Sequence, residues 1–62
     1  MVTAIRTTFD EAVSTIRGYE RITPDHIYYW SVYLTALEAV AFRAGDSVLA
    51  MEINGYRTTK LW

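Results

Sequence analysis

The sequence contains no cysteine, and histidine and proline each occur once, as His26 and Pro24. Without cysteine no disulfide can form, and a single imidazole leaves the common zinc sites without a ligand set. The three glycines form no phosphate-binding loop, and the acidic residues form no paired-carboxylate motif. We therefore expect no metal, no cofactor, no small-molecule substrate and no catalytic residue, so the sequence predicts a protein that is not an enzyme.

An excess of charge of either sign is also missing. Six Lys and Arg residues are balanced by seven Asp and Glu residues, which gives a formal net charge of −1. Such a balance does not favour bulk nucleic-acid binding, because the surface has no long-range field that attracts polyanions. Arg6, Asp10 and Glu11 interrupt the apolar run that a secretory signal needs. We expect the protein in the cytoplasm or within a cytoplasmically assembled particle.

What the sequence has in abundance is apolar surface. Its 62 residues are 52% hydrophobic and 15% aromatic, which indicates one small folded domain over residues 1–62. A domain of this size buries only about 60% of the surface that its unfolded chain exposes, so its stability is marginal. Because disulfides and metals are not available, we expect stabilisation by a protein partner or by self-association.

The first predicted helix covers about residues 9–17. Thr8 and Glu11 have the spacing of a capping box, which would start a helix at the residue after Thr8, and Gly18 can end it. Residues 2–7 are ambiguous, because they suit either the first turns of this helix or a short strand. In either case three residues should point toward the core: Phe9, Val13 and Ile16.

The second predicted helix covers about residues 24–44. Thr23 is a strong N-cap, Pro24 suits the first helical position, and Asp25 complements the positive end of the helix dipole. Gly45 follows the last turn and can end the helix. The short connector before this helix predicts that it packs antiparallel to the first one.

The second helix has an unusually wide apolar face. At about 100° per residue, apolar side chains cover roughly half of its circumference. They are Tyr29, Trp30, Tyr33, Leu34, Ala36, Leu37, Val40, Ala41 and Ala44. A narrow polar stripe consists of Ser31, Thr35 and Glu38. Glu38 either marks the solvent side of the helix or pairs with an Arg of a neighbouring chain. We expect a protein interface on the large apolar side chains Tyr29, Trp30, Tyr33 and Leu37.

The C-terminal segment, about residues 47–62, contains the strongest turn signal. Asn54-Gly55 is the preferred pair for a two-residue type I′ turn, and it lies between two runs of strand-compatible residues. The segment therefore predicts a β-hairpin with a cross-strand ion pair between Glu52 and Arg57. Its inward face should consist of Leu49, Met51, Ile53 and Tyr56. The predicted fold class is α+β: two antiparallel helices followed by this hairpin, to which residues 2–7 could add a third strand.

His26 follows Asp25, and an Asp–His pair is compatible with catalysis. No Ser, Cys or second His lies at a spacing that would supply a nucleophile and an orienting group, however. Capping of the helix N-terminus explains the position of His26 better.

The segment AFRAGDSVLAMEINGYRTT, about a third of the chain, resembles the helix, glycine and hairpin of small phage head-completion proteins of the gpW type. This resemblance implies a virion or particle component. Together with the apolar face it predicts a non-enzymatic assembly module, either a small homo-oligomer or a subunit of a larger particle.

Two other functions remain open at this point. The hairpin carries Arg57, Lys60, Tyr56 and Trp62, which a ribbon-type nucleic-acid-binding protein could use on phosphates and bases. The apolar run 27–42 is shorter than the roughly 20 residues of a membrane span, so a membrane role would be that of an accessory subunit lying on the bilayer.

Overall fold

The computed structural model describes residues 2–61, and within them the fold is three helices with no strand. Helix α1 runs over Val2–Gly18, α2 over Pro24–Arg43 and α3 over Ser47–Thr59, with 17, 20 and 13 residues. The predicted α+β class is therefore wrong, because the described chain is all-α.

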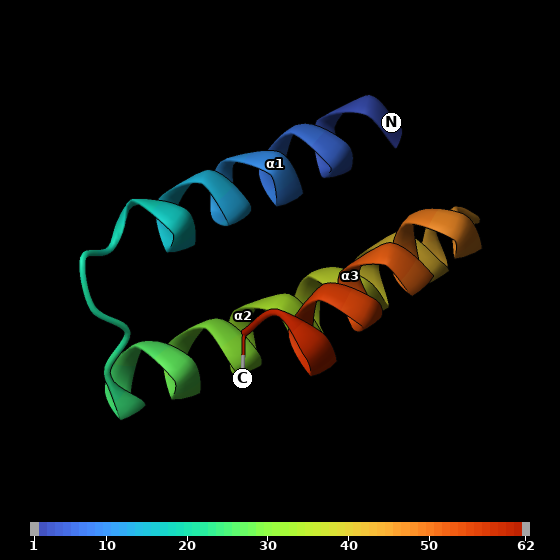
Figure 1. Ribbon diagram of the computed structural model, residues 1–62. Helices are drawn as coiled ribbons and strands as arrows, with labels where there is room; N and C mark the ends of the chain where they lie inside the picture. The colour runs from blue at the N-terminus through green and yellow to red at the C-terminus, as the bar shows by residue number, and fades with distance from the viewer. Residues whose placement is uncertain (1, 62) are drawn as a thin grey trace.

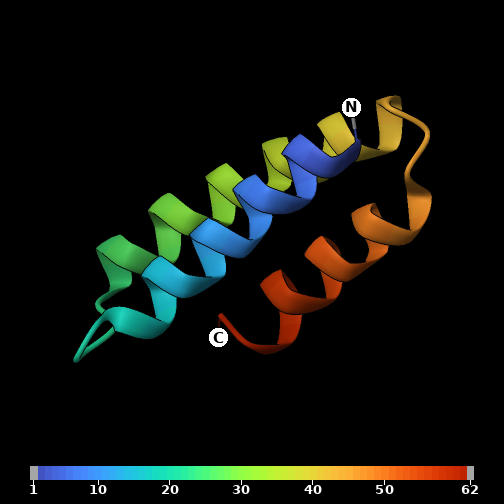
Figure 2. The same cartoon turned by 90° about the horizontal axis from the view of Figure 1, so that it is seen from above.

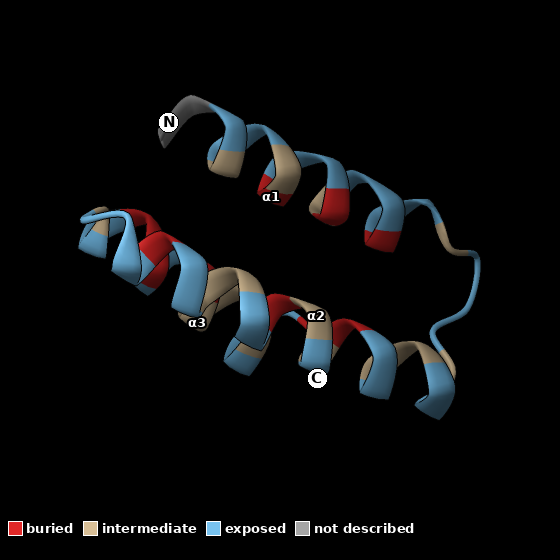
Figure 3. Ribbon diagram, turned by 180° about the vertical axis from the view of Figure 1, so that it is seen from behind, coloured by how far each residue is buried: buried red, intermediate tan, exposed pale blue. Residues whose placement is uncertain are grey.

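The three helices pack as a small elongated bundle of 34 × 17 × 15 Å (Figure 1). Helix α1 runs antiparallel to α2, and α2 runs antiparallel to α3, so the first and third helices are parallel (Figures 1 and 2). The closest pair is α2 with α3, and α1 lies over both. The buried sides of the helices face one another in Figure 3.

Helix α1 begins earlier than the capping box at Thr8 predicts. The hydroxyl of Thr8 donates a hydrogen bond to the carbonyl oxygen of Ala4, 2.9 Å away, as a residue inside a helix does. Residues 2–7 are thus the first turns of α1, and the possible third strand is absent. The apolar spacing explains this early start, because Ile5 continues the row of core contacts made by Phe9, Ala12 and Ile16.

The start of α2 is confirmed as the sequence predicts. Thr23 is the N-cap and Pro24 occupies the first turn. The hydroxyl of Thr23 accepts a hydrogen bond from the backbone N–H of His26, and Nδ1 of His26 accepts one from the backbone N–H of Thr23, both at 3.3 Å. This reciprocal pair satisfies two N–H groups that the helix itself leaves free.

A three-residue junction connects α2 to α3. The backbone N–H of Gly45 donates to the carbonyl oxygen of Phe42, and that of Asp46 donates to Ala41, both at 3.0 Å. This is the Schellman pattern, and it needs the left-handed conformation that Gly45 adopts at φ 85°. The carboxylate of Asp46 then accepts a hydrogen bond from the backbone N–H of Leu49, 3.0 Å away. One residue therefore closes the α2 cap and starts α3.

The predicted β-hairpin over 47–62 is wrong over the described residues, because α3 continues through Asn54 and Gly55. The predicted pair of Glu52 with Arg57 is also absent. Glu52 instead forms an ion pair with Arg6 of α1. The hydrogen bond to Glu52 and the charge of its carboxylate raise the pKa of Arg6.

The same apolar residues fit a helix as well as a strand, which explains the wrong prediction. Leu49 and Ile53 are buried and Tyr56 packs on the core, as either periodicity requires. The two readings differ at Met51, which the hairpin places inside but which is 74% exposed. Ala50 takes the inward position and is 6% exposed. A two-stranded ribbon is marginal in water, whereas a third helix buries its apolar face against two others.

The core lies where the three helices meet. It consists of Phe9, Ala12, Ile16, Trp30, Leu34, Ala41, Leu49, Ala50, Ile53 and Leu61. Its centre is formed by Leu34, Leu49 and Ile53, each fully buried and worth about 1.5–3 kcal/mol of burial free energy. Of the inward residues predicted on the first helix, Phe9 and Ile16 are buried and Val13 packs against the core.

Glu38 connects α2 to α3. Its carboxylate lies 3.0 Å from Nη2 of Arg57, and the side-chain amide of Asn54 donates to it at 3.4 and 3.5 Å. Both charged side chains are largely shielded from water, with 23% and 28% exposure for Arg57 and Glu38. Glu38 therefore faces α3 rather than the solvent side of α2, and the Arg with which it pairs belongs to the same chain.

We expect Gly55→Ala to stabilise the protein, because a glycine inside a helix costs about 1 kcal/mol relative to alanine. An added Cβ at Gly55 would meet nothing within 4 Å. The melting temperature should rise by about 4–8 °C per kcal/mol in a domain of this size, as followed by circular dichroism at 222 nm. In a type I′ turn the same change would destabilise, so a lower melting temperature would contradict the helix.

Gly45→Ala is the matched control. Its Cβ also has open space, but the backbone at φ 85° is unfavourable for alanine by about 1–2 kcal/mol. This substitution should lower the melting temperature.

Candidate interaction surface

One side of α2 is exposed along most of its length and carries no charged side chain between Asp25 and Arg43. We call this surface the outer face of α2. It consists of Tyr28, Tyr29, Val32, Thr35, Ala36, Ala39 and Val40. The two tyrosines and Val32 are 74%, 57% and 55% exposed. A row of exposed apolar residues with charges only at its ends has the anatomy of an interaction surface.

The outer face follows from the position of the buried residues on the same helix. Trp30, Leu34 and Ala41 are buried against α1 and α3. Val32 and Ala36 lie two positions before and after Leu34. Their side chains therefore point about 160° from that of Leu34 and away from the other helices. Because Val32 and Ala36 are apolar as well, α2 is apolar on both sides.

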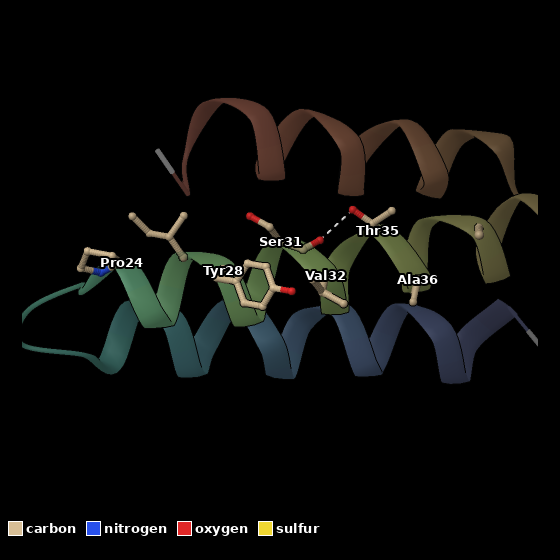
Figure 4. A pocket seen from close by; sticks show the side chains of 8 residues that line it. Pro24, Tyr28, Ser31, Val32, Thr35 and Ala36 are labelled. Carbon is tan, nitrogen blue, oxygen red and sulfur yellow. Dashed lines mark hydrogen bonds between the residues drawn. The ribbon is translucent and has the colours of Figure 1, made fainter.

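A shallow hollow of about 920 Å³ lies along one edge of the outer face, as Figure 4 shows. It is lined by Pro24, Ile27, Tyr28, Ser31, Val32, Thr35, Ala36 and Ala39. All of these residues belong to α2, so the hollow is open on the side opposite the helix. The hydroxyl of Thr35 donates to the backbone oxygen of Ser31 at 2.7 Å, and the side-chain oxygen of Ser31 has no hydrogen-bond partner within the described part of the chain.

The apolar surface continues from α2 onto α3. Phe42, Val48 and Met51 are all strongly exposed. Phe42 and Met51 line a second hollow, of about 330 Å³, together with Glu38 and Asn54. This smaller hollow has a polar side, so it is a less uniform surface than the outer face of α2.

The four predicted interface residues lie in different environments. Tyr29 belongs to the outer face, and Tyr33 is half-buried and packs against the core. Trp30 is 8% exposed and belongs to the core, and Leu37 is partly buried against it. The interface role stays a prediction. Among these four residues, Tyr29 has the most exposed side chain and is the best placed for it.

The indole of Trp30 has a structural role that fixes it in place. Its Nε1–H donates a hydrogen bond to the hydroxyl of Tyr19, 3.1 Å away. Its ring packs edge-on against Tyr33, with ring centres 5.1 Å apart. The ring of Tyr19 also stacks on His26, with ring centres 4.0 Å apart. This cluster holds the loop between α1 and α2 on the bundle.

Sequence reasoning missed Tyr28, Val32 and Ala39 as members of the exposed surface. The signal that could have found them is the absence of charge on the side of α2 opposite Leu34 and Ala41. An ordinary surface helix has charged residues there. This missing charge was easy to overlook, because α2 has apolar residues on its core side as well as on its exposed side.

The side chain of His26 belongs to the cap at the start of α2. Its Nδ1 is used in the capping box and its ring stacks on Tyr19. Within residues 2–61 no three His, Cys, Asp or Glu side chains lie close enough to hold a metal ion. The position of His26 is explained by the cap.

The nucleic-acid-binding alternative has lost the structural feature on which it depended. The ribbon proposed for nucleic-acid binding is absent from the described chain, Arg57 is paired with Glu38, and Trp62 lies outside the described residues. Among the described helices, none combines the length and hydropathy that crossing a membrane requires.

No known protein family, curated protein or solved structure matches this chain. The resemblance to phage head-completion proteins depended on a hairpin after the long helix. Since α3 replaces that hairpin, the resemblance no longer supports a virion role.

We expect Trp30→Ala to destabilise the protein much more than Tyr29→Ala. Removing a buried tryptophan costs about 3–5 kcal/mol, which is most of the stability of a domain this small. Removing Tyr29, which is 57% exposed and packs edge-on against Trp30, should lower the free energy of unfolding by only about 0.5–1.5 kcal/mol. Urea unfolding followed by circular dichroism, at a protein concentration where each variant is monomeric, measures both. Equal losses would contradict the division of α2 into a core side and an outer face.

Proposed function

We propose that this protein is a non-enzymatic protein–protein assembly module, a small homo-oligomer or a subunit of a larger particle, and that it associates through the outer face of α2. The observation that carries the proposal is the uncharged, exposed apolar surface between Asp25 and Arg43. We assign this function to the cytoplasm or to a cytoplasmically assembled particle.

The side chains of the outer face suit a protein interface. Tyr28 and Tyr29 offer large rigid rings that lose little conformational entropy on binding, and tyrosine is enriched among the residues that dominate binding energy. Thr35, Ala36 and Ala39 are small, so another helix can approach the backbone of α2 closely. Large and small residues on one surface favour interdigitation with a second helix.

A small-molecule site fits the outer face less well. Ligand pockets bury about 70–90% of a ligand's surface, and a hollow lined by a single helix cannot enclose a molecule to that extent. A membrane surface fits less well too, because interfacial helices are rich in Lys and Arg beside their apolar face. Among the 20 residues of α2, Arg43 is the only Lys or Arg.

We expect Val32→Glu to weaken self-association at least about tenfold, or about 1.4 kcal/mol, because it buries a carboxylate at the centre of the surface. Sedimentation velocity over about 5–500 µM protein, a range that spans weak to moderate affinities, measures the effect. Circular dichroism should show an unchanged fold, since Val32 is half exposed.

Ser14→Glu is the matched control, because it adds the same charge at an exposed position of α1. It should leave association unchanged. A wild-type chain that stays monomeric over the whole concentration range would contradict self-association. Equal association of the wild type and of Val32→Glu would show that the outer face of α2 is not the surface used.

A further inference from the structure

The two charges that bound the outer face of α2 are opposite in sign and symmetrically placed. Asp25 and Arg43 each lie nine residues from Leu34, one before it and one after. At about 100° per residue both point directly away from the buried side of Leu34, and both are exposed. Neither forms an ion pair within the described part of the chain. They are separated by about 27 Å along the helix.

The apolar side chains between these charges are distributed unevenly by size. The large rings of Tyr28 and Tyr29 lie near the N-terminal end, six and five residues from Leu34 respectively. Ala39 and Val40 occupy the matching positions toward the C-terminal end. Closer to the centre, Val32 and Ala36 are matched in the same way. Each larger side chain thus has a smaller counterpart at the same distance from the helix centre.

From this arrangement we propose that the outer face of α2 binds a second copy of this chain, with the two α2 helices antiparallel about a two-fold axis at the level of Leu34. Asp25 of each copy then lies opposite Arg43 of the other. Tyr28 and Tyr29 reach the level of Val40 and Ala39 of the other copy. This inference rests on the proposed assembly function and specifies its partner and its geometry.

A parallel arrangement of two α2 helices is disfavoured by the same residues. It would place Asp25 against Asp25 and Arg43 against Arg43, and like charges across an interface suppress association. It would also bring the tyrosines together at one end and leave the small residues without partners at the other. A closed two-fold pair uses the same surface twice and leaves no copy of it free.

The expected affinity is modest. The contact is a strip one helix wide and about 30 Å long, which is at the low end of specific interfaces. We expect a dissociation constant in the micromolar range, so the dimer should depend on protein concentration.

Charge reversal tests the pairing of Asp25 with Arg43. Asp25→Arg and Arg43→Asp should each weaken dimer formation at least about tenfold, because every dimer then holds two repulsive contacts. The double variant Asp25→Arg/Arg43→Asp should recover dimer formation, since the opposite charges meet again. Asp10→Arg on α1 is the control for net charge and should have no effect. Circular dichroism confirms that each variant keeps its helices.

Cysteine cross-linking tests the register and does not depend on charge. The chain has no cysteine of its own, so each variant carries a single thiol. In the antiparallel pair Val32 of one copy lies at the level of Ala36 of the other, so their Cβ atoms can approach the roughly 3.5–4.5 Å that a disulfide typically spans. A mixture of Val32→Cys and Ala36→Cys should therefore form the mixed disulfide under mild oxidation. Each variant alone should form little, because like positions are offset by about 6 Å along the axis. Intact mass spectrometry separates the three products.

The outcomes distinguish this inference from the proposed function. If Val32→Glu abolishes association but like cysteines cross-link to each other, the outer face is the interface and the antiparallel geometry is wrong. If the double charge reversal fails to recover a dimer that both single reversals abolish, the Asp25–Arg43 pairing is also wrong. If the wild type is a monomer at every concentration, self-association itself fails.

Discussion

The fold depends on the packing of α2 against α3, which the junction at Gly45 and Asp46 makes possible. The left-handed glycine ends α2, and the carboxylate of the next residue caps α3 within the same three-residue connection. So short a connection forces the two helices to lie side by side, and Leu34 then packs with Leu49 and Ile53 at the centre of the core. The ion pair between Glu38 and Arg57 holds the same two helices together at their edge.

This packing also decides which part of α2 is free. With α1 and α3 covering one side, the opposite side has only solvent beside it, although it is nearly as apolar as the buried side. A domain of 62 residues has too few elements to cover a helix that is apolar on two opposite sides. The proposed function follows from that limit, since a second chain can bury what the first cannot. The opposite charges of Asp25 and Arg43 at its two ends favour an antiparallel partner helix on that surface.

Features that depend on neighbouring residues could be predicted from the sequence, whereas features that depend on contacts between helices could be predicted only in part. The start of α2 could be predicted because Thr23, Pro24 and His26 act within a single turn. The candidate surface was predicted only in part, because Tyr29 and Trp30 are adjacent in the sequence yet one is exposed and the other is in the core. Nothing local distinguishes them, since the difference lies in where α1 and α3 pack.

The sequence by itself determined the two ends of α2, because caps and a left-handed glycine act on the backbone beside them. It also determined that the protein has more apolar surface than a small domain can bury. Only the tertiary structure decided that residues 47–59 form a helix and which side of α2 remains outside. The physical reason is that Leu49, Ile53 and Tyr56 fit either periodicity, so the choice depends on the helices available to pack against.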